Sequence, residues 1–316
     1  MVVLGSGDYQ FEVSGDNWGK LPDNWRYLEA TAVAIDSGDN VYVFNRGGHP
    51  VIVFDRDGNF LRSWGEDIFT TPHGIAIGPD DSVYCVDSGD HTVRKFTSSG
   101  KLLLTIGDPG NPSKLLSGDP FNKPTHVAID PRNGDIFVSD GYSNARVHKY
   151  SEDGTYQFSW GESGTEPGKF NIAHNIAIDS NGWVYVADRE NRRIQIFDSS
   201  GNYETQWVNL SRSAATCVDL RTNLVYVGEY FAGIVSNATA NQLGPRVTIF
   251  DTAGEVLARL GEESYGDAPG RFYSPHGIAV DSKGNIFVAE VSYMDYGVNM
   301  DPPRELRSMQ KLCKLQ

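Results

Sequence analysis

The sequence predicts an all-β protein, a six-bladed β-propeller that fills residues 1–316 as a single domain. Two observations lead to this prediction: one pattern recurs six times along the chain, and each copy contains short strand-like runs separated by polar turns. Four short strands per repeat, at a spacing of roughly forty to fifty residues, are typical of propeller blades. The 34 glycines and the aromatic content of 11% suit such a fold.

Each repeat begins with an apolar-Ala-apolar-Asp run, continues through a polar turn, and ends its second strand with apolar-Tyr/Phe-Val and usually an acidic residue. The six copies begin at Thr31, His73, Thr125, His174, Ala215 and His276. Most copies then continue into a third strand such as "VIVFD" or "RIQIF", a turn such as "RDGN", and a fourth strand. Tight turns of this kind join antiparallel neighbours, so we expect each blade to be an antiparallel sheet.

The sixth repeat is incomplete at its C-terminal end. It contains two strands, an irregular segment "VSYMDYGVNMDPPRE", and a third strand within "LRSMQKLCKL". We expect "YQFEV", near the N-terminus, to supply the missing strand, because this pairing closes the ring and covers both free edges.

The composition bounds the partners and the cellular compartment. A net charge of −14 argues against a surface that follows nucleic-acid phosphates, and no Lys/Arg run alternates with aromatic residues. No apolar stretch approaches the length of a membrane span. "MVVLGSGDYQFEV" shows no export signal, so we expect a cytoplasmic protein, or a secreted one if the chain is processed. Cys85, Cys217 and Cys313 have no CxxC spacing and are expected to be free thiols.

Histidine occupies the first position of alternate repeats, at His73, His174 and His276. The first strand of each blade lines the central channel, so these positions should lie about 120° apart around the axis. Three converging imidazoles suit Zn²⁺, or a similar divalent metal, with one coordination position left open. We therefore predict a metal site at these three residues. His126 lies one place after this histidine column and is a candidate substrate contact.

Long connections and loop residues point to the same face of the propeller. The loops that follow the second strands place Arg46, Tyr142 and Arg189 at nearly the same register, beside the column. A divalent cation and an Arg next to a tyrosine favour its phenolate, which can act as a base. An Arg side chain suits a substrate carboxylate. The acidic residues that end most second strands are expected to serve the fold, because nearly every repeat has one: Asp87, Asp140, Asp188, Glu229 and Glu290.

Several of these segments resemble the peptidyl-α-hydroxyglycine α-amidating lyase (peptidylamidoglycolate lyase) family, six-bladed propellers of NHL-type repeats. The similar segments are "PHGIAI", "DGYSNARV", "AHNIAID", "VADRENRRIQIF" and "PHGIAV", and the resemblance covers all six blades. It implies Zn²⁺ on the three histidines, a catalytic base at Tyr142, and Arg46 and Arg189 holding or polarising the substrate. It also implies a structural Ca²⁺ on the backbone carbonyls of Val33 and Ile75. The acidic calcium ligand of the family is Gly277 in this chain, so we expect weak Ca²⁺ binding or none.

The resemblance implies a Zn²⁺-dependent lyase that cleaves a C–N bond at an α-hydroxylated (carbinolamide) carbon of a small molecule or short peptide. The products would be an amide and a glyoxylate-like carbonyl compound, and a separate oxygenase would act upstream. Two alternatives remain open. One is a metal-dependent hydrolase of an ester, ether or lactone on the same propeller. The other is a non-catalytic NHL scaffold that binds protein or RNA.

Overall fold

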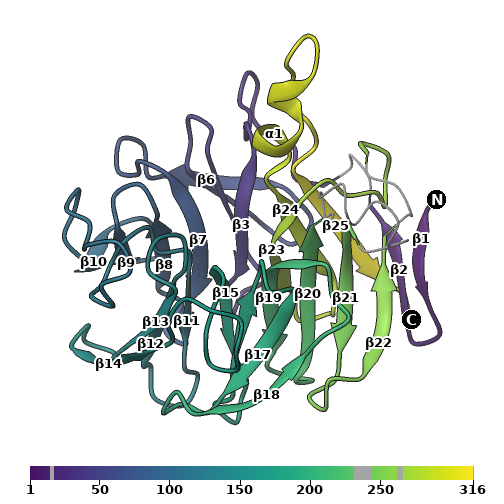
Figure 1. Ribbon diagram of the computed structural model, residues 1–316. Helices are drawn as coiled ribbons and strands as arrows, with labels where there is room; N and C mark the ends of the chain where they lie inside the picture. The colour runs from purple at the N-terminus through teal and green to yellow at the C-terminus, as the bar shows by residue number, and fades with distance from the viewer. Residues whose placement is uncertain (15–17, 231–243, 262–265, 316) are drawn as a thin grey trace. The chain divides into compact units, whose positions relative to one another are not determined.

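The computed structural model describes residues 1–14, 18–230, 244–261 and 266–315 (Figure 1). Its strands form six antiparallel sheets, one for each repeat, which confirms the all-β fold of six propeller blades. By internal packing the chain divides into two compact units. The first unit comprises Met1–Trp64, Leu210–Asp219 and Leu224–Gln316, and the second comprises Gly65–Asn209 and Leu220–Asn223. The single domain expected from the sequence stays a prediction.

The second unit contains three four-stranded sheets in which consecutive strands are neighbours. The second blade consists of β7 (Pro72–Ile77), β8 (Val83–Asp87), β9 (Thr92–Phe96) and β10 (Leu102–Ile106). The third consists of β11 (His126–Ile129), β12 (Ile136–Asp140), β13 (Arg146–Tyr150) and β14 (Tyr156–Trp160). The fourth consists of β15 (Ala173–Ile178), β16 (Val184–Asp188), β17 (Arg193–Phe197) and β18 (Tyr203–Trp207).

The first unit contains the other three sheets. The first blade consists of β3 (Ala30–Ile35), β4 (Val41–Asn45), β5 (Val51–Phe54) and β6 (Phe60–Trp64). The fifth consists of β19 (Arg212–Asp219), β20 (Leu224–Tyr230), β21 (Arg246–Phe250) and β22 (Val256–Leu260). The sixth is a five-stranded sheet in the order β1 (Val3–Ser6), β2 (Tyr9–Val13), β25 (Met309–Lys314), β24 (Ile286–Glu290) and β23 (Pro275–Val280).

The inner strands of the blades are buried and the outer strands are partly exposed. Every residue of β16 is buried, whereas β18 exposes its first three residues. Apolar residues can fill both faces of an inner strand because neighbouring blades cover it, as in the shared core of the second and third blades around Val86 and Val138. The first strands that carry the histidine column are also mostly buried.

The N-terminal strand closes the sixth blade as the sequence predicts. In β2, Phe11 pairs with Lys314 of β25, and Figure 1 shows the purple β2 beside the yellow C-terminal strand. The additional strand β1 at the outer edge was not predicted. The segment expected to be irregular between β24 and β25 contains a short helix, α1 (Ser292–Asp295), and a 3₁₀ turn over Gly297–Asn299.

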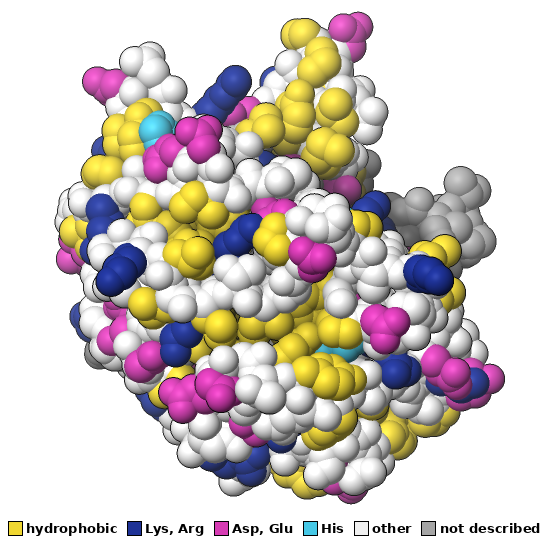
Figure 2. All heavy atoms as spheres, turned by 90° about the vertical axis from the view of Figure 1, so that its left-hand side faces the viewer, with side chains coloured by type: hydrophobic (Ala, Val, Ile, Leu, Met, Phe, Trp, Pro, Cys, Tyr) yellow, Lys and Arg dark blue, Asp and Glu magenta, His cyan; other side chains and the backbone are white. Residues whose placement is uncertain are grey.

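Charged side chains of both signs are dispersed over the face drawn in Figure 2. On that face the basic side chains lie singly among acidic and apolar ones and form no continuous basic stripe. Among the described residues, no helix is long and apolar enough to cross a membrane. The long connection between β20 and β21, which we expect on the histidine face, lies mostly outside the described residues.

Candidate metal centre and active site

The histidine column coincides with a β-bulge at the start of the first strands. In the second blade Pro72 pairs with Asp87 and Gly74 with Val86, so His73 is the extra residue between two ladder pairs. The same shift occurs in four other blades, at Thr31, His174, Ala214 and His276. A bulge turns the extra side chain away from the regular alternation and is frequent next to active sites. In the fifth blade the bulged residue is Ala214, so the predicted position, Ala215, was wrong by one residue.

His73 is held by its backbone neighbours in a defined tautomer. The side chain is buried, and its Nδ1 lies 2.6 Å from the carbonyl oxygen of Thr125. A carbonyl oxygen can only accept, so Nδ1 carries the hydrogen and Nε2 keeps its lone pair. This arrangement is the usual one for a metal-binding histidine, whose other ring nitrogen is fixed by a hydrogen bond.

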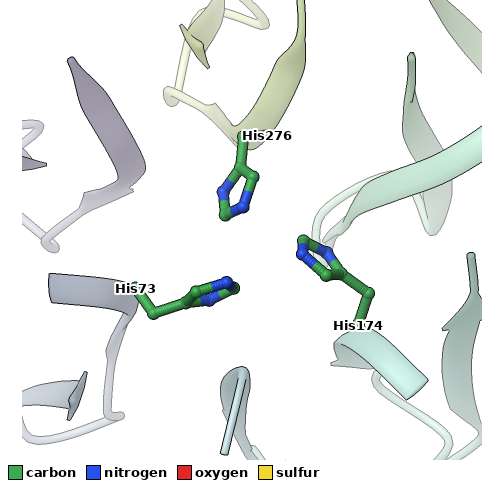
Figure 3. A group of neighbouring side chains, drawn as sticks. All are labelled: His73, His174 and His276. Atoms are coloured by element: carbon green, nitrogen blue, oxygen red, sulfur yellow. The ribbon is translucent and has the colours of Figure 1, made fainter. Parts of the chain in front are cut away.

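His73 and His174 converge on the hydroxyl of Tyr142. The Nε2 atom of His73 lies 2.9 Å from Tyr142 Oη, and the Nε2 atom of His174 lies 3.1 Å from the same oxygen. The centroids of the two imidazole rings are 5.0 Å apart, and Figure 3 shows the rings pointing toward one another. The second unit alone thus brings together two predicted metal ligands and the predicted base.

His276, in the first unit, repeats the environment of His73. It is buried, and its Nδ1 lies 2.6 Å from the carbonyl oxygen of Thr31. Because Nδ1 of His276 carries the hydrogen, its Nε2 carries the lone pair. Each of His73, His174 and His276 is buried and offers a ring nitrogen as a possible metal ligand (Figure 3), and their binding of one shared ion stays a prediction. Three histidine ring nitrogens suit zinc or a similar divalent metal, because neutral imidazole nitrogen is one of the preferred ligands of such metals.

The loop that carries Tyr142 is fixed at both ends. Asp140, the last residue of β12, is buried and accepts hydrogen bonds from the backbone of Asn122 and the side chain of Asn144. Gly141 lies so close to the next blade that a Cβ atom there would be 2.0 Å from the carbonyl oxygen of Ala173. Only glycine permits this approach, which brings Tyr142 against the strand of His174.

Arg189 directly follows β16 and lies beside Tyr142. Its Cζ is 5.6 Å from the centre of the Tyr142 ring, a distance suited to a cation–π contact. Its Nε donates to Glu190 Oε1 at 2.8 Å, and its backbone N–H donates to the carbonyl of Ile172, two residues before His174. The predicted grouping of Arg189, Tyr142 and His174 is therefore present within the second unit.

Arg46 directly follows β4 in the first unit and is paired with a residue that sequence reasoning missed. Its Nη1 lies 2.5 Å from Oε1 of Glu29, a fully buried carboxylate. Glu29 lies outside the repeat pattern. The available signal was Asn45, which replaces the acidic residue at the end of the second strand in this blade alone.

His126 is the first residue of β11 and packs against Gly74, the residue after His73 in β7. A Cβ atom at Gly74 would be 2.8 Å from His126 Cδ2. Among the described residues, its buried Nδ1 has no hydrogen-bond partner, and burial lowers the pKa of the ring to about 4. A neutral imidazole with a free nitrogen is compatible with the predicted substrate contact, which stays a prediction.

The residues implied in calcium binding lie in buried strands. Val33 belongs to β3 of the first unit and Ile75 to β7 of the second, and their role stays a prediction. At Gly277, a Cβ atom would lie 2.6 Å from Cα of Ala32. A carboxylate at this position would require the neighbouring strand to shift, so the close packing agrees with the absence of an acidic ligand here.

The repeats and the sheets define a β-propeller of the NHL-repeat class. The NHL repeat model matches residues 69–96, 121–150, 170–197 and 272–294. The chain is 32% identical to mouse NHL repeat-containing protein 3 over 292 residues, which covers 85% of this chain and 79% of the mouse protein. It belongs to this family of NHL-repeat proteins.

Other relatives carry the name of an enzyme. The chain is 33% identical over 258 residues to peptidyl-alpha-hydroxyglycine alpha-amidating lyase 1 of Drosophila melanogaster, covering 75% of this chain and 46% of the fly protein. It is 32% identical over 230 residues to rat peptidylglycine alpha-amidating monooxygenase, covering 61% of this chain and 23% of the rat protein. The chain therefore spans less than half the length of these two relatives.

Solved structures support the fold alone. A streptogramin B lyase matches 98% of this chain and 97% of its own with a TM-score of 0.60 at 12% identity. The gluconolactonase XC5397 of Xanthomonas campestris matches 99% of this chain and 97% of its own with a TM-score of 0.59 at 13% identity.

Proposed function

We propose that this protein is a metal-dependent lyase that cleaves the C–N bond of an α-hydroxylated (carbinolamide) carbon and releases an amide and a glyoxylate-like carbonyl compound. The observation that carries the proposal is the position of the Tyr142 hydroxyl, in hydrogen-bonding range of Nε2 of both His73 and His174. The relatives named as α-hydroxyglycine amidating lyases give independent support.

In this proposal His73, His174 and His276 hold one Zn²⁺ or a similar divalent ion. All three are buried, and the hydrogen bonds at Nδ1 of His73 and His276 place the proton there, so that Nε2 carries the lone pair a metal ligand needs. When bound, the metal would supply Lewis-acid polarisation of the substrate hydroxyl oxygen.

Tyr142 is the proposed base. As phenolate it removes the proton from the substrate hydroxyl, the oxygen electron pair forms the C=O bond, and the C–N bond breaks. The amide nitrogen keeps the bonding pair and takes up the proton that Tyr142 removed, so the products are a primary amide and the carbonyl compound and Tyr142 is again a phenolate. Asp140 and Gly141 hold the tyrosine loop in place during this transfer.

The two arginines have different proposed tasks. Arg189 lies beside Tyr142 and binds the carboxylate of the substrate, with His126 as a further contact. Arg46 donates hydrogen bonds to the α-hydroxyl group of the substrate. It also forms an ion pair with Glu29. A small molecule or a short peptide bearing an α-hydroxyglycine end has the groups that this site would recognise.

The test is product identification with the purified, zinc-loaded chain and an N-acyl-α-hydroxyglycine. We expect glyoxylate and the corresponding amide in equal amounts, and a strong loss of both in Tyr142→Phe. Tyr156→Phe, which alters an exposed tyrosine of β14, is the matched control. Turnover of an ester or lactone panel without any glyoxylate release would replace the lyase by the hydrolase alternative.

A further inference from the structure

The first blade departs from a rule that the other five follow. In those blades the acidic residue at the end of the second strand accepts a hydrogen bond from the backbone that leads into the first strand. The pairs are Asp87 with Thr71, Asp140 with Asn122, Asp188 with Asn171, Glu229 with Ser211, and Glu290 with Tyr273. In the first blade this position is Asn45, which bonds its own loop at Gly47 and His49.

The buried carboxylate of the first blade is instead Glu29, on the segment before β3. Its side chain is 0% exposed. Oε1 accepts from Arg46 Nη1 at 2.5 Å, and Oε2 accepts from the backbone N–H of Met294 at 2.9 Å. Burying a carboxylate costs free energy unless both oxygens accept hydrogen bonds. Because the first blade has its buried carboxylate at Glu29 and not at the end of the second strand, we look for a role in the two groups that Glu29 binds.

Met294 belongs to α1, in the segment between β24 and β25. Figure 1 shows α1 as a projection above β24. A second hydrogen bond holds this segment: Ser274 Oγ donates to Asp295 Oδ2 at 2.6 Å. Ser274 lies two residues before His276. Within the first unit, Glu29 therefore connects Arg46 with α1. The helix α1 is in turn bonded to Ser274, close to the proposed metal ligand His276.

We propose that Glu29 is a positioning residue that orients Arg46 and couples its position to the order of α1. When Arg46 turns toward a substrate, Glu29 loses one of its two partners, and the anchoring of α1 changes with it. The effect on turnover rests on the proposed function of Arg46. The coupling between Arg46 and α1 does not.

The coupling is tested by hydrogen–deuterium exchange of the full chain, followed in peptides covering residues 291–300. We expect Glu29→Gln and Arg46→Ala each to raise exchange in this segment roughly tenfold or more, because a hydrogen bond to a charged group is lost or weakened. The matched control is Glu229→Gln, since Glu229 is also 0% exposed and pairs with Arg246 at 2.8 Å. It should leave this segment unchanged.

Met294→Pro provides a second variant should Glu29→Gln fold poorly. It removes the N–H that donates to Glu29 without touching Glu29 or Arg46, and proline is tolerated in the first turn of a helix. It should raise exchange in residues 291–300 as the glutamate variant does. Unchanged exchange in both Glu29→Gln and Met294→Pro, or in Arg46→Ala alone, would overturn the coupling.

Kinetics supply the readout that separates positioning from a structural role. With an N-acyl-α-hydroxyglycine, Glu29→Gln should lower kcat/KM roughly tenfold while metal content stays at the wild-type level, and Glu229→Gln should lower thermal stability without this effect. Equal kcat/KM losses in the two variants would reduce Glu29 to a stability residue. If the wild type releases no glyoxylate, the proposed lyase function fails, and the exchange experiment still decides the role of Glu29.

Discussion

The hydroxyl oxygen of Tyr142 lies 2.9 Å from Nε2 of His73, although the two residues are 69 positions apart in the chain. His73 reaches this position from a bulge at the start of β7, and Tyr142 from a loop held against β15 by Gly141. Because Nδ1 of His73 donates to a carbonyl, the nitrogen that faces the phenol carries a lone pair. The same lone pair is the one that a metal would take.

The first prediction concerns metal content. We expect about one zinc or similar divalent ion per chain, because three neutral imidazoles with one open position suit such an ion. Elemental analysis of the wild type and of the triple variant His73→Ala/His174→Ala/His276→Ala tests this, with His91→Ala as a control outside the column. Equal metal in the wild type and the triple variant would rule out the site.

Removing the Tyr142 hydroxyl should slow the reaction strongly and leave the fold intact. Tyr142→Phe keeps the ring that contacts Arg189, so metal content and thermal stability should remain close to wild type. Turnover should fall by roughly 10²–10⁴, the usual contribution of a general base. Full activity in this variant would mean that another group takes the proton.

Arg189→Ala should weaken substrate binding more than it slows turnover. The guanidinium lies beside the Tyr142 ring, and its proposed role is to bind a substrate carboxylate, so KM should rise by a larger factor than kcat falls. Arg132→Ala, which removes a partly exposed arginine paired with Asp130, controls for the loss of one positive charge. A fall in kcat with an unchanged KM would contradict the binding role.

Calcium should add little stability. Thermal unfolding of the metal-loaded chain should be nearly the same with and without excess Ca²⁺, because backbone carbonyls and waters without a carboxylate make a poor site. Gly277→Asp should destabilise the protein, since its Cβ would lie 2.6 Å from Ala32 Cα. A large stabilisation by Ca²⁺ that a chelator reverses would show that the site exists without the acidic ligand.

Glu290 should make stability depend on pH. Burial raises the pKa of this carboxyl from 4.5 to about 7. The folded state therefore binds the proton more tightly than the unfolded state, and this contribution, present below pH 4.5, is lost as the pH rises toward 7. The loss is about 3 kcal/mol for a shift of this size.

Urea unfolding at pH 5 and pH 8 measures this contribution. Glu290→Gln stays neutral at both pH values, so its unfolding free energy should fall less between them than that of the wild type. Asp153→Asn, at an exposed turn, is the control. Parallel pH dependences of the wild type and Glu290→Gln would show that Glu290 does not titrate in this range.

The repeat, the strand order and the histidine column were all predictable from the sequence. These follow from local periodicity and turn chemistry, which each blade repeats, so one copy predicts the next. The pairing of "YQFEV" with the last strand was also predictable, because an incomplete sheet with a free edge needs a partner.

Strand register and the contacts between distant segments become defined only when the chain is folded. The bulge shifts the column of the fifth blade to Ala214, a choice set by backbone pairing that the residue pattern does not encode. The role proposed for Glu29 depends on its hydrogen bonds to Arg46 and Met294. Met294 is 265 positions away in the chain, so the sequence around Glu29 does not predict this contact. Local sequence specifies strands through short-range preferences. The atoms that meet at a site are fixed by the packing of whole blades, which no single segment contains.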